Sequence, residues 1–326
     1  MKVLITGAAG FVGGNLTALL KSKDIDVRGV DSFSGYYSRE MKNIRIAGLG
    51  ISDLISDFDI TSHSKLEELL NTYKPNTVIH LAAQGGVRAS RTDPSPYIAS
   101  NQQGFLNVLE LSERHGVQKF IYASSSSVYG DQAIAPFRED VILSAPKSLY
   151  ALSKLSNEIV ASHFPGKGMQ RIGLRLFTVY GPWGRPDMAI FRLLASYRLG
   201  EKFQLTANLN VLRDFTFVDD ASQTIFELIT SNSFSDMNEI LNIAGGKPYS
   251  LQDLLDALKA QGIEPVIEKR EHDPLDVNLT HGSTEKLAGV GLTVPNTSLA
   301  DGLRKTIKWM ESQNSENIRT WYEYSK

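Results

Sequence analysis

The start of the chain combines a short apolar strand, a glycine-rich turn and an amphipathic helix, and this combination restricts the fold most strongly. Residues 2–6 are apolar and partly β-branched, which predicts a buried strand. Glycines at positions 7, 10 and 13 follow, and they favour a tight turn. A helix is predicted over residues 11–22, because apolar side chains recur at helical spacing. They are Val12, Leu16, Leu19 and Leu20.

Strands and helices alternate through the first half of the chain. Further strands are predicted at residues 27–30, 78–82, 119–123 and 171–177, and helices at residues 64–73, 99–114 and 149–162. Such alternation builds βαβ units, in which helices cover both faces of a parallel sheet. The predicted fold class is therefore α/β, with a doubly wound parallel sheet of the Rossmann type.

The alternation breaks down after the strand at residues 171–177. Pro182, Gly184 and Pro186 cluster in one loop, and the segments beyond them are shorter. We expect residues 1–177 to form a nucleotide-binding domain and residues 178–326 to form mainly a smaller α/β substrate domain. A helix at 217–230 and a strand at 239–244 predict that residues 217–244 return to the first domain.

The glycine-rich turn is a candidate cofactor site. A turn between a strand and a helix can bring backbone N–H groups against a pyrophosphate: Gly7 permits the turn, Gly10 the close approach and Gly13 tight helix packing. Asp31 ends the second strand, where a carboxylate accepts hydrogen bonds from ribose hydroxyls. Residues 32–34 hold no arginine for a 2′-phosphate, so NAD is favoured over NADP. Asp59 and Ile60 are candidates for contacts with adenine.

Tyr150 and Lys154 are spaced four residues apart and are therefore expected on one face of a helix. A free phenol has a pKa of about 10. A lysine ammonium at about 4 Å supplies roughly the 4 kcal/mol that lowers this pKa by about three units. The pair is a candidate general base.

Composition excludes several classes of function. The net charge of −2 provides no field to attract nucleic acid, so no nucleic-acid partner is expected. The chain has no cysteine, and its six histidines form no metal-ligand spacing, so no metal is predicted. We predict neither a signal peptide nor a membrane span, and a cytoplasmic protein.

Five ordered motifs together resemble the extended short-chain dehydrogenase/reductase family: the glycine turn, Asp31, residues 80–83, the serine run at 124–127 before Val-Tyr-Gly, and the Tyr150/Lys154 pair. The resemblance implies that Ser125 is catalytic beside Tyr150 and Lys154. It also implies NAD contacts from the following residues: Phe11, Val12, Leu81, Ala82, Ala83, Asn101 and Phe177.

Ser126 and Ser127 separate this chain from two activities of the family. Nucleotide-sugar dehydratases carry an Asp-Glu pair at these positions, and sugar-nucleotide decarboxylases keep a glutamate before Val-Tyr-Gly. The serines supply no acid to protonate a departing hydroxyl, so dehydration is disfavoured.

Residues 175–189, 84–88 and 101–104 are similar to segments of UDP-glucuronate 4-epimerases. The resemblance implies that Arg185 holds the sugar carboxylate, for which a guanidinium is suited. It further implies that Ser126, Ser127 and Thr178 contact the sugar, and that Arg213, Arg270 and Asp276 contact the UDP group. The implied activity is NAD-dependent inversion of C4 in a UDP-uronic acid through a 4-keto sugar, with Tyr150 as the base. A homodimer, formed through the two long helices near residues 100 and 150, is also implied.

Other interpretations remain open at this point. A neutral UDP-hexose 4-epimerase, acting on UDP-glucose or UDP-N-acetylglucosamine, would use the same catalytic residues. A decarboxylase would release carbon dioxide, and a net oxidoreductase would accumulate NADH. An inactive NAD-sensing protein with this fold is disfavoured because Tyr150 and Lys154 are both present.

Overall fold

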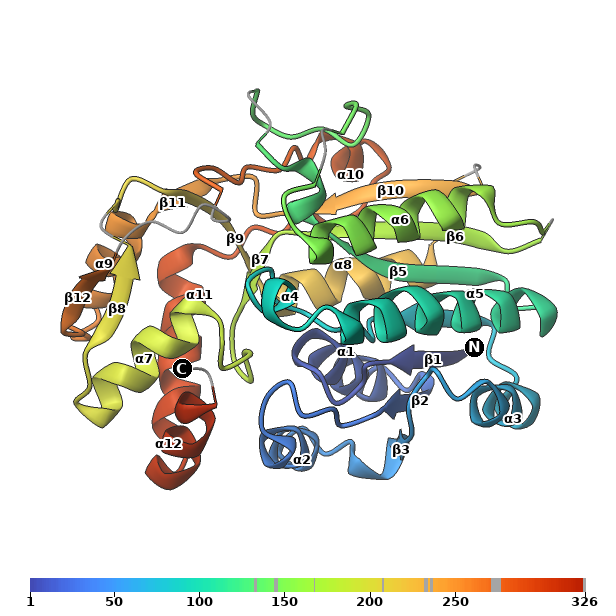
Figure 1. The fold of residues 1–326 in the computed structure, drawn as a ribbon, viewed down its shortest axis with the longest axis horizontal. Helices are drawn as coiled ribbons and strands as arrows, with labels where there is room; N and C mark the ends of the chain where they lie inside the picture. Colours follow the sequence, from blue (N-terminus) through green and yellow to red (C-terminus); the bar gives the residue numbers. More distant parts are fainter. Residues whose placement is uncertain are drawn as a thin grey trace.

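A computed structural model describes residues 1–131, 134–143, 146–166, 168–206, 208–231, 234, 237–270 and 277–324, without the side chains of Thr206 and Arg270. Within these ranges no helix is both long and apolar enough to cross a membrane. Figure 1 shows a larger part built on an extended sheet, with a smaller part beside it.

The larger part contains a seven-stranded sheet in which every pair of neighbouring strands is parallel. This confirms the predicted Rossmann-type fold class. The strand order is β10-β6-β5-β4-β1-β2-β3, so it reverses between β1 and β4. The strands are β1 (Lys2–Thr6), β2 (Asp26–Asp31), β3 (Ile55–Asp57), β4 (Thr77–His80), β5 (Lys119–Ser125), β6 (Gln170–Leu176) and β10 (Asn238–Ile243).

Helices cover both faces of this sheet (Figure 1). On one face, α1 (Phe11–Ser22) packs against α8 (Val218–Thr230) over a core that includes Val3 and Ile5. On the other face, α3 and α5 pack over a core that includes Leu4, and α6 lies beside them. These helices are α3 (His63–Tyr73), α5 (Phe105–Arg114) and α6 (Leu149–His163).

Several local features differ from the sequence prediction, and three of them concern the site. The helix expected at residues 99–114 begins earlier, as a π-helix, η2 (Tyr97–Gly104), that continues into α5. Strand β4 ends at His80 rather than at Ala82, because its neighbour β1 ends at Thr6, whose carbonyl accepts the last hydrogen bond, from the N–H of Leu81. Helix α2 (Arg39–Gly48) was not predicted.

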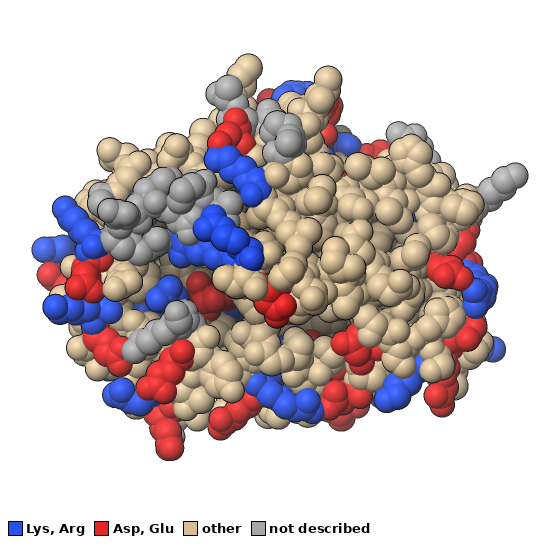
Figure 2. All heavy atoms as spheres, in the orientation of Figure 1, with Lys and Arg blue, Asp and Glu red and all other residues tan. Residues whose placement is uncertain are grey.

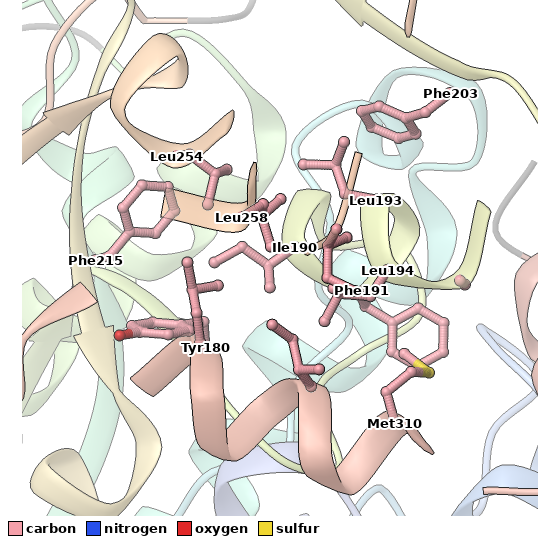
Figure 3. Close-up of a cluster of buried hydrophobic side chains, with 14 of the residues drawn as sticks. Tyr180, Ile190, Phe191, Leu193, Leu194, Phe203, Phe215, Leu254, Leu258 and Met310 are labelled. Carbon is pink, nitrogen blue, oxygen red and sulfur yellow. The ribbon is translucent and has the colours of Figure 1, made fainter. Parts of the chain in front are cut away.

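The smaller part contains two short sheets and three main helices around one apolar cluster. The sheets are β11-β9-β7 and β12-β8. Their strands are β7 (Thr178–Tyr180), β8 (Phe203–Thr206), β9 (Leu212–Phe217), β11 (Pro248–Ser250) and β12 (Ile267–Arg270). The helices are α7 (Ala189–Leu199), α9 (Leu251–Lys259) and α11 (Leu299–Ser312), followed by α12 (Ser315–Glu323). Figure 3 shows the cluster, which includes Tyr180, Ile190, Phe191, Leu193, Leu194, Phe203, Phe215, Leu254, Leu258 and Met310.

The chain returns from the smaller part to the large sheet. Helix α8 covers one face of that sheet, and β10 pairs with β6 at its edge, with Asn238 opposite Arg171 and Ile243 opposite Leu176. Short α10 (Glu285–Gly289) lies against β10. The division into domains at residue 177, with a return at 217–244, stays a prediction.

Candidate active site

A cleft of about 860 Å³ lies between the two parts of the molecule. It is lined by residues at the carboxyl ends of β1, β2, β4, β5 and β6 and by residues of the smaller part. Its position spans the point where the strand order reverses, which is where ligands bind in open α/β sheets. Figure 2 shows Lys and Arg side chains around a hollow on this face, with acidic side chains beside them.

The glycine turn has the geometry of a phosphate cradle. Gly7 has a φ of +73°, and a Cβ there would lie 2.7 Å from the backbone nitrogen of Ala82. A Cβ on Gly13 would lie 2.2 Å from the carbonyl oxygen of Gly7, so helix and turn are packed in direct contact. Helix α1 starts after Gly10 without a side-chain cap, and Phe11, Val12 and Gly13 line the cleft. An uncapped helix N-terminus of this kind fits the pyrophosphate of a dinucleotide.

Asp31 is held in place at the end of β2 by three hydrogen bonds. Its carboxylate accepts from the backbone nitrogens of Ala9 (3.1 Å) and Phe33 (2.7 Å) and from Nζ of Lys42 (3.2 Å). Lys42 is buried on α2 and also lines the cleft. The sequence prediction considered only residues 32–34 and missed this cation, because α2 itself was not predicted.

The other predicted cofactor residues occupy different surroundings. Asp59 is exposed, and its Oδ1 accepts from the backbone nitrogen and the hydroxyl of Thr61, both at 2.8 Å. The remaining predicted residues that line the cleft are Gly10, Ile60, Leu81, Ala82, Ala83 and Phe177.

Asn101 is buried in the π-helix and bonds to the protein rather than lining the cleft. Its Oδ1 accepts from the backbone nitrogen of Gln84 (2.7 Å), and its Nδ2 donates to the Gln84 carbonyl and to Oγ of Ser153. The side chain therefore ties the loop after β4 to α6, the helix that carries Tyr150.

Tyr150, Lys154 and Ser125 converge in the cleft from α6 and β5. Helix α6 begins with Ser148, whose hydroxyl accepts from the backbone nitrogen of Ala151. Tyr150 is therefore in the first turn, and Lys154 follows it by about one turn. Ser125, the last residue of β5, is within hydrogen-bond reach of the Tyr150 hydroxyl. All three line the cleft.

The expected effect of Lys154 on the Tyr150 phenol is wrong. Burial raises the pKa of Tyr150, whereas the hydrogen bond with Ser125 and the charge of Arg185 lower it, and Asp187 raises it again. The Nζ of Lys154 instead donates to the carbonyl of Ala123 at 2.8 Å. Burial lowers the pKa of Lys154 to about 8.

A buried ion pair that sequence reasoning missed lies one helix turn beyond Lys154. Glu158 on α6 accepts two hydrogen bonds from Arg175 on β6, Nε to Oε1 at 3.0 Å and Nη2 to Oε2 at 2.8 Å. It also accepts a hydrogen bond from the hydroxyl of Ser124, the neighbour of Ser125 on β5. The pair therefore fastens α6 to the two strands beside it.

The predicted sugar-binding residues surround the same end of the cleft. Ser126 and Ser127 form the first turn of the 3₁₀-helix η3 (Ser126–Tyr129), and Oγ of Ser125 donates to Oγ of Ser127 at 3.1 Å. Thr178, the first residue of β7, lines the cleft, as does Arg185.

Arg185 has a carboxylate partner within its own loop. Its Nε donates to Oδ1 of Asp187 (3.0 Å) and its Nη2 to Oδ2 (2.5 Å). Tyr36 donates its hydroxyl to the same Oδ2 (3.0 Å), and its ring lies 5.5 Å from the guanidinium. Burial opposes ionisation of Asp187, but the charge of Arg185 and the hydrogen bonds from Arg185 and Tyr36 together outweigh burial and lower the pKa of this carboxyl.

The predicted nucleotide-binding residues are only partly described. Arg213 on β9 lines the cleft, and its Nη1 donates to the carbonyl of Leu212 at 2.9 Å. Arg270 ends β12, but its side chain is not described, and Asp276 lies outside the described residues.

A family model for the NAD dependent epimerase/dehydratase family matches residues 3–244. The chain belongs to this family. The UDP-glucuronate 4-epimerase of Thermodesulfobacterium geofontis is 34% identical over 322 residues, which cover 97% of this chain and 98% of that protein.

Solved structures of two proteins share the fold closely. The UDP-glucuronic acid 4-epimerase of Bacillus cereus, in complex with UDP-glucuronic acid and NAD, has a TM-score of 0.87 and 31% identity, over 95% of this chain and 99% of that one. MoeE5, solved with UDP-glucuronic acid and also with UDP-glucose, each with NAD, has TM-scores of 0.84 and 0.82 at 30% identity. Each match covers 95% of this chain and 99% of that one.

Proposed function

We propose that this protein is an NAD-dependent 4-epimerase of UDP-uronic acids that converts UDP-glucuronate to UDP-galacturonate. The observation that carries the proposal is the position of Arg185, which lies in one cleft with Tyr150 and Ser125 and acts electrostatically on the Tyr150 phenol. An arginine so close to the proton-transfer group is placed to bind the carboxylate of a sugar whose C4 reacts. The likeness to the two UDP-glucuronate 4-epimerases supports this assignment.

Tyr150 and Ser125 carry the proton transfer in this proposal, and Lys154, one helix turn from Tyr150, is the third proposed catalytic residue. Tyr150 takes the proton of the 4-hydroxyl, and Ser125, bonded to the phenol, stabilises the phenolate that performs this step. Bound NAD supplies the acceptor and donor of the C4 hydride. Burial raises the pKa of Tyr150, and the hydrogen bond with Ser125 and then the positive charge of Arg185 act in the opposite direction.

The sugar carboxylate must also be protected during the reaction. A ketone at C4 stands β to the carboxylate at C6, so the 4-keto sugar could lose carbon dioxide. Ser126, Ser127, Thr178 and Arg185 are the polar groups proposed to hold the carboxylate in one unreactive orientation. Arg213, together with Arg270 and Asp276, is proposed to bind the UDP group.

One observation favours a second candidate, a 4-epimerase of neutral UDP-hexoses. The charge of Arg185 is already balanced by Asp187, so a neutral sugar would leave the pair intact. MoeE5, which is similar to this chain, is solved with UDP-glucose as well as with UDP-glucuronic acid. The two candidates share Tyr150, Ser125 and Lys154 and differ in the use of Arg185.

We also propose that the protein forms a homodimer through η2, α5 and α6. The π-helix η2 contacts both α5 and α6, and the three elements expose large apolar side chains. They are Ile98, Leu106, Leu152 and Ile159, of which Ile98 and Ile159 are more than half exposed. Light scattering after size-exclusion chromatography is expected to give the mass of two chains, and the double variant L152E/I159E the mass of one. A monomeric wild type would overturn this proposal. The cytoplasmic location stays a prediction.

Incubation with UDP-glucuronate and NAD, followed by proton NMR, tests the proposed function. The expected result is UDP-galacturonate at equilibrium with the substrate, with no net NADH absorbance and no carbon dioxide. Absence of UDP-galacturonate, or a pentose product, would overturn the proposal.

A further inference from the structure

The guanidinium of Arg185 has little room for a second carboxylate while Asp187 is bound to it. Asp187 occupies the Nε and Nη2 edge, which is one of the two edges that can grip a carboxylate with two parallel hydrogen bonds. The remaining nitrogen, Nη1, lies against the backbone of Gly85, where a Cβ would approach it to 2.5 Å.

Asp187 is itself held from the opposite side of the cleft. Tyr36, in the loop between β2 and α2, donates its hydroxyl to Oδ2 of Asp187 and stacks its ring near the guanidinium. Gly86 makes room for this hydroxyl, because a Cβ there would lie 2.2 Å from it. Asp187 therefore has two independent partners, and replacing it on Arg185 must compensate for both.

The pair is nevertheless accessible. The side chains of Arg185 and Asp187 are 26% and 28% exposed, and both line the cleft beside Tyr150. Because both side chains line the cleft, a ligand carboxylate of similar strength can reach the guanidinium and exchange with Asp187.

We propose that Asp187 sets the preference of this enzyme among UDP-sugars by competing with the sugar carboxylate for Arg185. A neutral UDP-hexose leaves the Arg185–Asp187 pair intact, whereas a UDP-uronate must displace Asp187 before Arg185 can grip its carboxylate. Uronate affinity is thereby held below the value that a free Arg185 would give. This inference rests on the proposed function and assigns Asp187 as a positioning residue that acts through Arg185.

The test is calorimetric titration of the NAD-loaded full chain with UDP-glucuronate and, separately, with UDP-glucose. D187N removes the competing charge at constant size. It is expected to lower the dissociation constant of UDP-glucuronate by about three- to tenfold and to change that of UDP-glucose by less than about twofold. Y36F loosens Asp187 without removing it, so it is expected to act in the same direction with a smaller effect. Because Y36F keeps its ring, it tests the idea even if D187N does not fold.

D131N is the matched control. Asp131 pairs with Lys147, which also lines the cleft, so D131N removes a negative charge near the site without touching Arg185. It is expected to leave the ratio of the two affinities unchanged. If D131N shifted that ratio as much as D187N does, the general electrostatic field of the cleft would explain the effect, and the inference would be overturned.

Two further outcomes would overturn it. In one, D187N lowers the affinity for both sugars equally, which is the result expected if Asp187 has a purely structural role. In the other, neither D187N nor Y36F changes the ratio. If the wild type converts UDP-glucuronate in either case, only the inference fails. If the wild type and D187N both fail to bind UDP-glucuronate, the proposed function fails as well.

Discussion

Two arginine–carboxylate pairs, Arg175–Glu158 and Arg185–Asp187, differ in their access to solvent. In the Arg175–Glu158 pair, the side chains are 4% and 7% exposed. In the Arg185–Asp187 pair, they are 26% and 28% exposed. Both pairs make two hydrogen bonds between guanidinium and carboxylate. The same chemistry therefore serves two purposes, a permanent fastening of α6 in one place and an exchangeable contact in the other.

The difference follows from the cost of leaving a charge without a partner. Inside the protein an uncompensated arginine is strongly unfavourable, so Arg175 and Glu158 keep each other ionised and fixed. At the cleft, water or a ligand can replace one partner at small cost. The first pair should matter to folding and the second to substrate choice.

Breaking the buried Arg175–Glu158 pair should have the largest effect. E158Q leaves Arg175 buried without a counter-charge, and a loss of about 3–5 kcal/mol in the free energy of unfolding is expected. Chemical denaturation measures it. The control is E113Q. Its partner Arg171 lies on the same strand as Arg175 and is equally buried, but Arg171 also donates to the carbonyls of Ala161 and Phe164, and Glu113 itself is 22% exposed, so a smaller loss of about 1 kcal/mol is expected. Equal losses would contradict the account.

Breaking the Arg185–Asp187 pair in the cleft should affect activity rather than folding. R185M is expected to reduce kcat/KM for UDP-glucuronate by about 10- to 100-fold, as expected for loss of hydrogen bonds to a charged group. Its free energy of unfolding should change by about 1 kcal/mol or less. Initial rates and denaturation curves measured on the same preparation check both values. A destabilisation as large as that of E158Q would remove the distinction between the pairs.

Lys154 sharpens the comparison, because this buried cation donates to the Ala123 carbonyl rather than to a carboxylate. Its pKa falls from 10.5 to about 8 in the folded chain, so between these values the unfolded chain holds more protons. Stability contributed by this group must therefore rise with pH in that window.

The measurement is the difference in unfolding free energy between the wild type and K154M, both stripped of cofactor, from pH 8 to 9.5. The wild type is expected to gain roughly 1 to 2 kcal/mol relative to K154M across this range. Taking the difference removes the contribution of the buried tyrosines. A flat difference would mean that Lys154 is not desolvated as described.

The smallest effect on stability is expected for Ser124, which bonds to Glu158 of the buried Arg175–Glu158 pair. S124A removes one hydrogen bond to Glu158 but leaves both charges paired, so a loss of about 1 kcal/mol in stability is expected. S222A is a suitable control, since the buried hydroxyl of Ser222 has no partner among the described residues. Thermal unfolding compares the two. If S124A lost no more stability than S222A, Ser124 would not help to hold α6 against β5.

The sequence predicted those parts of the fold whose signals are local. Helix α1 was predicted to the residue, because Gly10 precedes its start and an apolar stripe marks its length. Helix α2 was missed because its buried residues include the cations Lys42 and Arg45. Their partners are distant in sequence: Lys42 meets Asp31, and Arg45 donates to the carbonyls of Ala9 and Trp183. No periodic pattern of apolar residues can reveal such contacts.

The candidate site shows the same limit. Tyr150, Lys154 and Ser125 were identified from motif spacing and family resemblance, and the structure brings them into one cleft. The carboxylates near them were not identified. Glu158 pairs with Arg175, which comes from another element of the fold, and Asp187 acts on the Tyr150 phenol from beside Arg185. Asp187 lies only two residues from Arg185, but the Tyr36 hydroxyl that holds it comes from 151 residues earlier.

The most direct test of the proposed function is a competition between UDP-glucuronate and UDP-glucose at equal concentrations, with the wild-type enzyme and NAD, followed by NMR. The account predicts that UDP-galacturonate forms faster than UDP-galactose, because only the uronate can use Arg185. Formation of UDP-galactose alone, or conversion of both sugars at equal rates, would contradict it.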